Sequence, residues 1–252
     1  MNIKHKIKIA NTFSKSAKYY DQYAYLQRKC GHTLCKLLGL VSKQYLLDAG
    51  CGTGWFSKYW KLCNNNIIAL DISPGMIMYA KRNKSAHMYL LGDIEQLPLM
   101  NSSIDIVYSN LAVQWCTDLK SALVEFFRVL KPGGKLALST LANGSLIELK
   151  QAWSKIDNNI HVNKFLSIKN ISNIFSIYRH SIFTKTYKIY YDKLLNLLKE
   201  IKGVGASYLY GRNTFGLTGS NKLKLLEKYW PNKSNQLLSL SYQVVYGILY
   251  YD

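Results

Sequence analysis

A run of nine residues, 46–54, constrains this chain more than any other: it reads Leu-Leu-Asp-Ala-Gly-Cys-Gly-Thr-Gly. Alternate glycines let the backbone turn sharply and approach a ligand closely, because no side chain stands in the way. Residues 55–62 can continue as a helix, whose first N–H groups would face that ligand. The glycine spacing matches neither the dinucleotide fingerprint nor the P-loop. The run therefore predicts a strand, a tight turn and a helix at a small-molecule site.

Two further acids follow Asp48 at regular intervals. Asp71 ends the apolar run 67–70, and Asp93 follows the run 89–92. The interval of roughly 22 residues is about the length of one strand–helix repeat. An acid at the end of a second strand can accept hydrogen bonds from both ribose hydroxyls, and a third can accept from an exocyclic amine such as that of adenine. Three acids in this register favour a nucleoside site over three unrelated turn or cap residues.

The remaining residues of the first half keep the same alternation. Residues 104–110 are β-branched and largely apolar, which predicts a fourth strand. A helix is expected over 119–130, because its apolar residues recur on one face. The sequence Lys-Pro-Gly-Gly at 131–134 should stop this helix and turn the chain. A fifth strand follows over 135–140.

These residues resemble the class I S-adenosylmethionine-dependent methyltransferases. The resemblance rests on 48–54, Asp71, 93–94 and the Leu-Lys-Pro-Gly-Gly run at 130–134. A narrower resemblance is to the malonyl-acyl-carrier-protein O-methyltransferases of biotin synthesis. It rests on 92–99, 109–116, 141–153 and 201–206. The similarity runs from about Ile9 to about Tyr250, so it covers nearly the whole chain.

The resemblance implies a Rossmann-like α/β fold with a seven-stranded, mostly parallel sheet, a C-terminal antiparallel hairpin strand and helices on both faces. We expect one domain over 1–252, with an N-terminal helical lid (1–40), a core that binds S-adenosylmethionine (44–142) and an acceptor side (143–252). S-adenosylmethionine would serve as co-substrate, without a metal. The cofactor-binding residues implied are Asp48, Gly50, Gly52, Gly54, Asp71, Ile72, Asp93, Ile94, Asn110 and Leu111.

The implied reaction methylates the free carboxylate of malonyl on its carrier protein, giving the methyl ester that primes pimeloyl synthesis for biotin. Two alternatives stay open: another small carboxylic acid, or RNA, as the acceptor. A carboxylate is ionised at neutral pH, so the reaction needs no general base. Neutral polar and aromatic groups around the acceptor, with a cation further out, would leave it nucleophilic. Our candidates for this role are Tyr20, Gln27, Trp115 and Lys202.

Both ends of the chain should build the acceptor side. One or two helices are expected within 12–38, with Tyr20, Tyr23, Gln27, Cys30 and Leu34 sharing a face. After the fifth strand the sequence predicts helices over 144–156, 167–176, 194–201 and 222–229, and strands over 181–191 and 242–250. The glycine-punctuated segment 202–208 should line the binding site.

The formal charge of +19 has two explanations. Only five of the 33 basic residues are Arg, and Lys, Asn, Ile and Tyr are residues that an AT-rich genome encodes readily. Alternatively, the charge captures an acidic partner, either nucleic acid or an acyl carrier protein. An RNA methyltransferase is disfavoured, because two motifs are absent: the Asn/Asp-Pro-Pro-Tyr motif that resembles base-amine methylation, and a Pro-Cys pair that would supply a covalent cysteine nucleophile. We expect a monomer that binds an acidic carrier protein and neither nucleic acid nor membrane.

From composition we expect a single domain located in the cytoplasm. The chain has no Gly/Ser/Pro-rich linker, no signal-like apolar segment and no run long enough to span a bilayer. The five cysteines and five histidines show no metal-ligand or disulfide spacing. Free thiols in a reducing cytoplasm are expected, with Cys51 packing as a small apolar residue.

Overall fold

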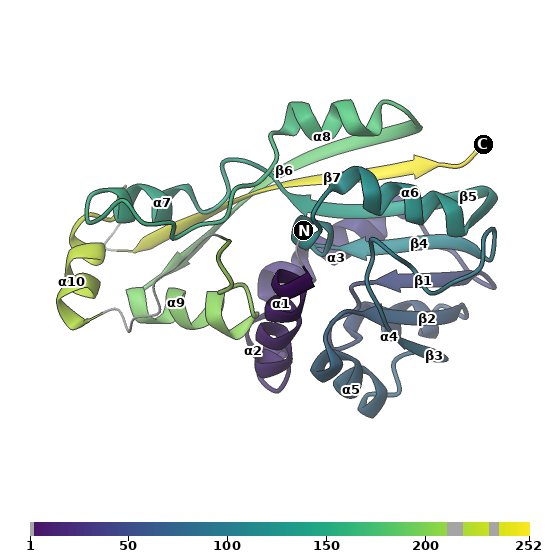
Figure 1. The fold of residues 1–252 in the computed structure, drawn as a ribbon, viewed down its shortest axis with the longest axis horizontal. Coiled ribbons are helices and arrows are strands. Elements are labelled where there is room, and N and C mark those ends of the chain that lie inside the picture. The colour runs from purple at the N-terminus through teal and green to yellow at the C-terminus, as the bar shows by residue number, and fades with distance from the viewer. Residues whose placement is uncertain (1–2, 211–218, 232–236) are drawn as a thin grey trace.

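One seven-stranded sheet carries the fold of the computed structural model, which describes residues 3–210, 219–231 and 237–252 (Figure 1). The strand order is β3-β2-β1-β4-β5-β7-β6. The strands are β1 (Tyr45–Ala49), β2 (Asn66–Asp71), β3 (Met88–Leu91), β4 (Ile104–Asn110), β5 (Leu130–Leu141), β6 (Arg179–Tyr191) and β7 (Leu238–Tyr250). The helices are α1 (Ile3–Ser16), α2 (Tyr20–Tyr23), α3 (Tyr25–Leu38), α4 (Trp55–Leu62), α5 (Pro74–Arg82), the 3-10 turn η1 (Val113–Trp115), α6 (Leu119–Val129), α7 (Ile147–Ser154), α8 (Ile168–Phe175), α9 (Leu194–Gly203) and α10 (Ser220–Lys228).

The five strands of the first half are parallel, as the resemblance implied. β1 pairs with β2 on one side and with β4 on the other, so the strand order reverses at β1. In open α/β sheets, the crevice outside the carboxyl ends of the strands at such a reversal is where ligands bind. The segments that follow β1, β2, β3 and β4 therefore meet at one edge.

Local capping chemistry fixes where the helices begin. The Ser73 hydroxyl accepts from the Met76 N–H at 3.3 Å, and Pro74 follows at the first helical position of α5. Asp118 caps α6 in the same way by accepting from Lys120 and Ser121. These caps lie at the edge of the sheet where the ligand crevice is expected.

The C-terminal strands form the expected antiparallel addition. β7 runs antiparallel to both β5 and β6 and lies between them. β6 and β7 extend past the parallel strands, and α7, α9 and α10 gather around their far part (Figure 1). The fold expectation of a Rossmann-like sheet with a C-terminal hairpin is confirmed.

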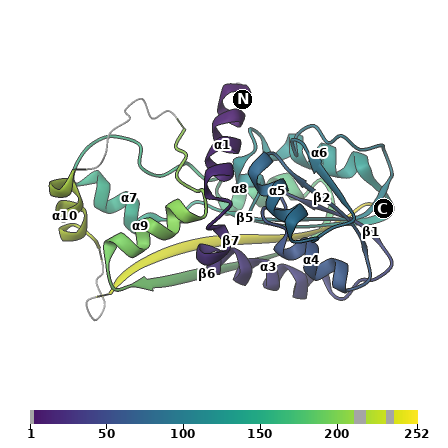
Figure 2. The ribbon, with the colours of Figure 1, turned by 90° about the horizontal axis from the view of Figure 1, so that it is seen from below.

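Two hydrophobic cores cover the two faces of the sheet. One core takes side chains from α3, α4 and α5 and continues to α7, α9 and α10. The other takes side chains from α6 and α8. Figure 2 shows α3 and α4 on the opposite side of the sheet from α6 and α8. Among the described helices, none is both long and apolar enough to cross a lipid bilayer.

The N-terminal region differs from the expectation. The first helix begins at Ile3 instead of near residue 12, and the chain breaks before Tyr20 and again at Ala24. The break separates the face that was expected to be continuous: Cys30 and Leu34 are buried in the core, with 0% exposure. Strong helix formers such as Lys at alternate positions near the N-terminus support a helix there without marking its start.

The turn expected at 131–134 lies inside β5. The helix before it ends at Val129, one residue earlier than expected, and the strand begins at Leu130. The pairing with β4 shifts from Ile104–Leu130 to Ile106–Lys135, so β5 bulges at the Lys-Pro-Gly-Gly segment. Gly133 takes a φ of +79° in this bulge, a conformation that glycine adopts readily.

Candidate active site

The glycine turn after β1 adopts the left-handed backbone that its sequence requires. Gly50, Gly52 and Gly54 have φ values of +80°, +55° and +84°. A Cβ on Gly50 would lie 2.3 Å from the Cβ of Ala112, and one on Gly54 would lie 2.2 Å from the Ser85 hydroxyl. Around Gly52 the nearest atom outside the turn is 3.8 Å away. Gly50 and Gly54 are thus needed for close packing, whereas a Cβ on Gly52 would make only an ordinary van der Waals contact, with Tyr20.

Asp71 is held by backbone donors beside this turn. Its carboxylate accepts from the Gly52 N–H at 2.9 Å and from the Ser73 N–H at 2.8 Å. Burial raises the pKa of Asp71 to about 6, against the lowering effect of these N–H groups. A carboxylate has about four acceptor positions, so lone pairs remain for a ligand's hydroxyls.

Asp48 is more deeply buried than Asp71. Its carboxylate accepts from the Ser57 hydroxyl at 2.6 Å, and burial raises the pKa of Asp48 to about 7. Asp48 therefore connects β1 to α4 beneath the glycine turn.

A pocket of about 690 Å³, here called the first pocket, opens at the reversal point of the sheet. Eight of the ten predicted cofactor-binding residues line it: Gly50, Gly52, Asp71, Ile72, Asp93, Ile94, Asn110 and Leu111. Asp48 and Gly54 are outside its lining, and support the turn from behind. The glycine cradle and the free lone pairs of Asp71 fit a nucleoside ligand.

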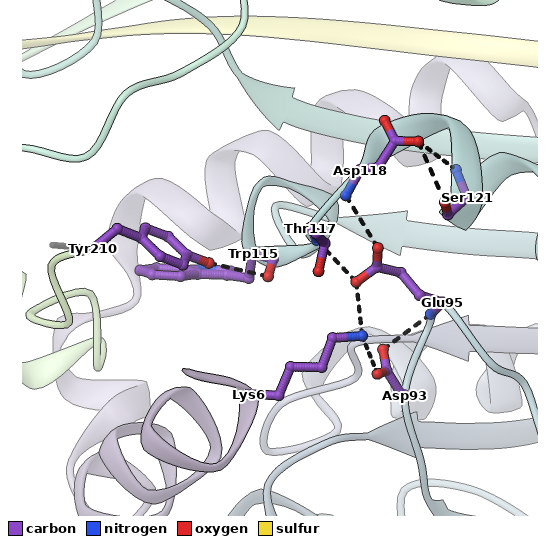
Figure 3. A network of polar contacts seen from close by, with 8 residues as sticks. All are labelled: Lys6, Asp93, Glu95, Trp115, Thr117, Asp118, Ser121 and Tyr210. Atoms are coloured by element: carbon purple, nitrogen blue, oxygen red, sulfur yellow. Dashed lines mark hydrogen bonds and ion pairs between the residues drawn. The ribbon is translucent and has the colours of Figure 1, made fainter. Parts of the chain in front are cut away.

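A salt-bridge network closes one side of the first pocket (Figure 3). Lys6 from α1 contacts Asp93, and its ammonium lies 2.7 Å from Glu95. Glu95 also accepts from the backbone N–H groups of Thr117 at 2.8 Å and Asp118 at 3.0 Å. Although burial alone would raise it, these donors lower the pKa of Glu95. The network ties α1 to the segment that carries η1.

Further contacts hold the N-terminal helices between the two halves of the molecule. The Ser14 hydroxyl lies 2.8 Å from that of Ser73 at the start of α5. On the other side, a Cβ on Gly203 would lie 2.2 Å from Tyr23, and one on Gly205 would lie 2.6 Å from Phe13. The small residues of the 202–208 segment therefore let α1 and α2 approach α9.

A second pocket adjoins the first on its acceptor side. Four residues line both pockets and form the wall between them: Phe13, Tyr20, Leu111 and Trp115. Phe13 and Trp115 pack edge to face, with ring centroids 5.4 Å apart. Burial, together with the nearby charge of Asp71, raises the pKa of Tyr20, so its hydroxyl stays protonated at neutral pH.

Of the four predicted acceptor-side residues, three line the second pocket and one lies outside it. Tyr20, Gln27 and Trp115 line the second pocket. Gln27 Oε1 is buried without a hydrogen-bond partner among the described residues, an arrangement that a ligand could complete. Lys202 is exposed on the last turn of α9 and lies outside the lining of both pockets, where Ile201 and Val204 take its place in the second. The structure gives no support to Lys202 as a cation near the acceptor.

Several residues of the site were missed by the sequence analysis. Lys6 and Glu95 close the first pocket, and His161, Asn163 and Glu200 line the second. Glu95 stands in the 92–99 motif, which was a usable signal. The others lie far along the chain from their partners, so no local pattern marks them.

The cysteines are free thiols, as expected, throughout the described part of the chain. Cys51 is buried, and burial raises the pKa of its thiol, which fits a packing role. In residues 3–210, 219–231 and 237–252, no cluster of three or more His, Cys, Asp or Glu side chains could hold a metal ion.

Comparison with solved structures shows the same fold at low sequence identity. The YcgJ protein from Bacillus subtilis superposes with a TM-score of 0.60 at 17% identity, covering 88% of this chain and 97% of that one. Geranyl diphosphate C-methyltransferase from Streptomyces coelicolor, solved with S-adenosyl-L-homocysteine, gives a TM-score of 0.53 at 14% identity, covering 88% and 78%. These similarities establish the fold alone.

Sequence comparison identifies the family. Residues 47–138 match the family model described as a methyltransferase domain. The malonyl-[acyl-carrier protein] O-methyltransferase of Yersinia pestis is 45% identical, over 97% of this chain and 91% of that protein. Those of Hamiltonella defensa and Buchnera aphidicola are 43% and 39% identical, over 98% and 97% of this chain and 96% and 98% of theirs. The chain therefore belongs to the family of malonyl-[acyl-carrier protein] O-methyltransferases, which are S-adenosylmethionine-dependent enzymes.

Proposed function

We propose that this chain transfers a methyl group from S-adenosylmethionine to the free carboxylate of malonyl on an acyl carrier protein. The product would be the methyl ester that primes pimeloyl synthesis for biotin. The observation that carries the proposal is the pair of adjoining pockets, because a donor in one and an acceptor in the other meet at a wall of four residues.

In the first pocket, the chain's own groups orient the co-substrate. Asp71 would accept from the ribose hydroxyls with the lone pairs that Gly52 and Ser73 leave free. Asp93, at the end of β3, would accept from the adenine amine. The sulfonium of S-adenosylmethionine supplies a methyl group on an excellent leaving group, so positioning is the main task of the protein.

In the second pocket, three of the lining side chains, all neutral, would surround the reacting end of the acceptor. Trp115 and Tyr20 would exclude water from the carboxylate as it meets the sulfonium, and Gln27 would hydrogen-bond the acceptor. Because the Tyr20 hydroxyl stays protonated, it can donate a hydrogen bond without repelling the carboxylate. No side chain has to remove a proton, since a carboxylic acid is ionised at neutral pH.

Residues 1–40 would act as a lid over both pockets, with Lys6 as its latch. Lys6 binds Asp93 and Glu95, so replacing it with Met should speed dissociation of S-adenosylmethionine by roughly 3- to 10-fold, the size of a partly exposed ion pair. Lys8→Met, on the exposed side of the same helix, is the control. Equal dissociation rates for the two variants, measured by stopped-flow fluorescence, would contradict the latch.

The carrier protein is the partner that the charge of +19 favours, since acyl carrier proteins are strongly acidic as a family. Association should slow markedly as salt rises past physiological strength, where the Debye length is ~8 Å. A rate that does not change with salt would instead favour a compositional origin of the lysines. We expect a monomer by sedimentation and an activity located in the cytoplasm, where free thiols persist.

Mass spectrometry of the carrier tests the proposed reaction. The protein is incubated with labelled S-adenosylmethionine and, separately, malonyl-carrier, acetyl-carrier and bulk RNA. Malonyl-carrier should gain one methyl on oxygen, whereas acetyl-carrier, which has no free carboxylate, should gain none. Methylated RNA without a methylated malonyl-carrier would overturn the proposal, and so would a methyl on carbon.

A further inference from the structure

One polar side chain of the second pocket has no part in the function described so far. His161 lies in the segment between α7 and α8, with 8% of its side-chain surface exposed. Its ring stacks on Trp153, with centroids 3.7 Å apart and planes inclined by 4°. Two separate contacts therefore fix this imidazole: the stacked indole and the carboxylate of Asp157.

Asp157 determines which ring nitrogen carries hydrogen. His161 Nε2 lies 2.7 Å from Asp157 Oδ1. Asp157 also accepts from the Asn159 N–H at 3.0 Å and from Lys222 on α10 at 3.2 Å. Although burial opposes it, the hydrogen bond from His161 and these other donors lower the pKa of Asp157, so it is an anion at neutral pH. An anionic carboxylate only accepts, so Nε2 carries its hydrogen and Nδ1 is left for another partner.

The second pocket contains few side chains that can carry a charge. Among the described residues that line the pocket, His161 alone can become a cation, and Glu200 alone can become an anion. Burial raises the pKa of Glu200, which reduces its tendency to be charged. Lys222 faces Asp157 and does not line the pocket. A carboxylate that enters the pocket thus has one cationic partner available, and Nδ1 has no hydrogen bond to any described residue.

We propose that His161, oriented by Asp157 and Trp153, binds the carboxylate of the acceptor through Nδ1 and selects acceptors that carry one. The inference rests on the proposed function and adds the residue that recognises the acceptor's charge. Nδ1 takes up a proton from solvent as the carboxylate binds, so His161 holds one carboxylate oxygen as an imidazolium while the other attacks. The O–CH₃ bond forms from a carboxylate lone pair as the S–CH₃ bond breaks. The electron pair of the broken S–CH₃ bond stays on sulfur. The ester that results is neutral, so the contact with His161 weakens and the product can leave.

His161→Gln is the direct test, because Gln keeps a hydrogen-bond donor and cannot take a charge. The variant should raise KM for malonyl-carrier by about 10- to 100-fold, the range of a hydrogen bond between charged partners. Affinity for the methyl-ester carrier should stay within about twofold of wild type, since that ligand has no charge to lose. Affinity for S-adenosylmethionine and the melting temperature should also stay unchanged.

Two further variants separate recognition from folding. Asp157→Asn leaves the imidazole in place and removes its anionic partner, so KM for malonyl-carrier should rise in the same direction by a smaller factor. His180→Gln, in β6 where the ring bonds the Tyr178 carbonyl, is the matched control and should leave KM unchanged.

Three results would overturn the inference. The first is an unchanged KM for malonyl-carrier in both His161→Gln and Asp157→Asn. The second is an equal fall in the affinities of His161→Gln for malonyl-carrier and for its methyl ester. The third is a lower melting temperature of His161→Gln with no change in KM. Failure of the proposed function is distinguishable, because wild type itself would then not methylate malonyl-carrier. Binding of malonyl-carrier to wild type and His161→Gln, measured by calorimetry, would still report on His161.

Discussion

The first and second pockets are built in different ways. The first is made at strand ends by the backbone: the glycine turn, the N–H groups that hold Asp71 and the close approach of Ala112. The second is made by side chains from widely separated parts of the chain, including Gln27 of α3, Trp115 of η1 and Glu200 of α9. The donor half of the reaction is therefore fixed by topology, whereas the acceptor half is fixed by individual side chains.

A change in the backbone-built pocket should have the largest effect. Gly50→Ala puts a Cβ 2.3 Å from Ala112 at a φ of +80°. We expect affinity for S-adenosylmethionine to fall by roughly 100-fold or more, ~2.8 kcal/mol, by titration calorimetry. Gly133→Ala is the matched control, because Gly133 has a φ of +79° and nothing within 4 Å of its Cβ position. Both variants carry the backbone strain, so an equal loss of affinity in the two would contradict the packing argument.

A change in the wall between the pockets should affect turnover instead of binding. Trp115→Ala removes the side chain that faces both pockets and packs on Phe13. We expect kcat to fall by roughly 100-fold while affinity for S-adenosylmethionine changes less than about threefold, the pattern of a contact made chiefly in the transition state. Trp115→Phe keeps an aromatic ring and should recover most of the rate. A fall in affinity that matches the fall in kcat would place Trp115 among the cofactor-binding residues only.

A substitution at a strand end should have a smaller effect on the affinity for S-adenosylmethionine. Asp71→Ala removes the acceptor for ribose hydroxyls and should weaken S-adenosylmethionine by roughly 1–3 kcal/mol. Asp105 provides the control: it lies at the start of β4 and accepts from the Tyr45 N–H and Lys131, and it does not line the first pocket. Calorimetry that finds Asp71→Ala and Asp105→Ala equal in affinity would contradict the assignment of Asp71.

A change in the acid behind the turn should alter how stability depends on pH, with no direct effect on ligand affinity. The folded-state pKa of Asp48 is raised to about 7, above the unfolded value near ~3.9. The folded protein then binds the extra proton, so this contribution to stability is full below the unfolded pKa and is lost as pH rises through about 7. Asp48→Asn should flatten the fall in free energy of unfolding between acidic and neutral pH, measured by urea denaturation. An unchanged slope would show that Asp48 is not protonated in the folded state.

The same division explains what the sequence could predict. The glycine turn, Asp71 and Asp93 follow apolar runs at a regular interval, so a local pattern located them and the sheet edge brought them together. No such pattern predicted the start of α1, because a lysine-rich segment is equally compatible with a helix and with an exposed tail. Gly54 and Asp48 belong to the motif but support it from behind, a distinction that depends on packing against Ser85 and Ser57.

The acceptor half needed the structure. Lys6 is 87 residues from Asp93, and Gln27 and His161 are likewise far apart in the sequence, so no periodicity relates them. Lys202 was chosen because it stands in a recognised motif, yet the helix continues to Gly203 and turns its side chain outward. The useful part of that segment is its small residues, which let Tyr23 and Phe13 approach.

A crystal structure with S-adenosylhomocysteine and a malonyl thioester would show where the donor and the acceptor bind. We predict the nucleoside between Asp71 and the glycine turn in the first pocket, and the malonyl carboxylate in the second, facing the sulfur between Tyr20 and Trp115. A malonyl group bound outside the second pocket, or a carboxylate turned away from the sulfur, would contradict the division of the reaction between a backbone-built and a side-chain-built pocket.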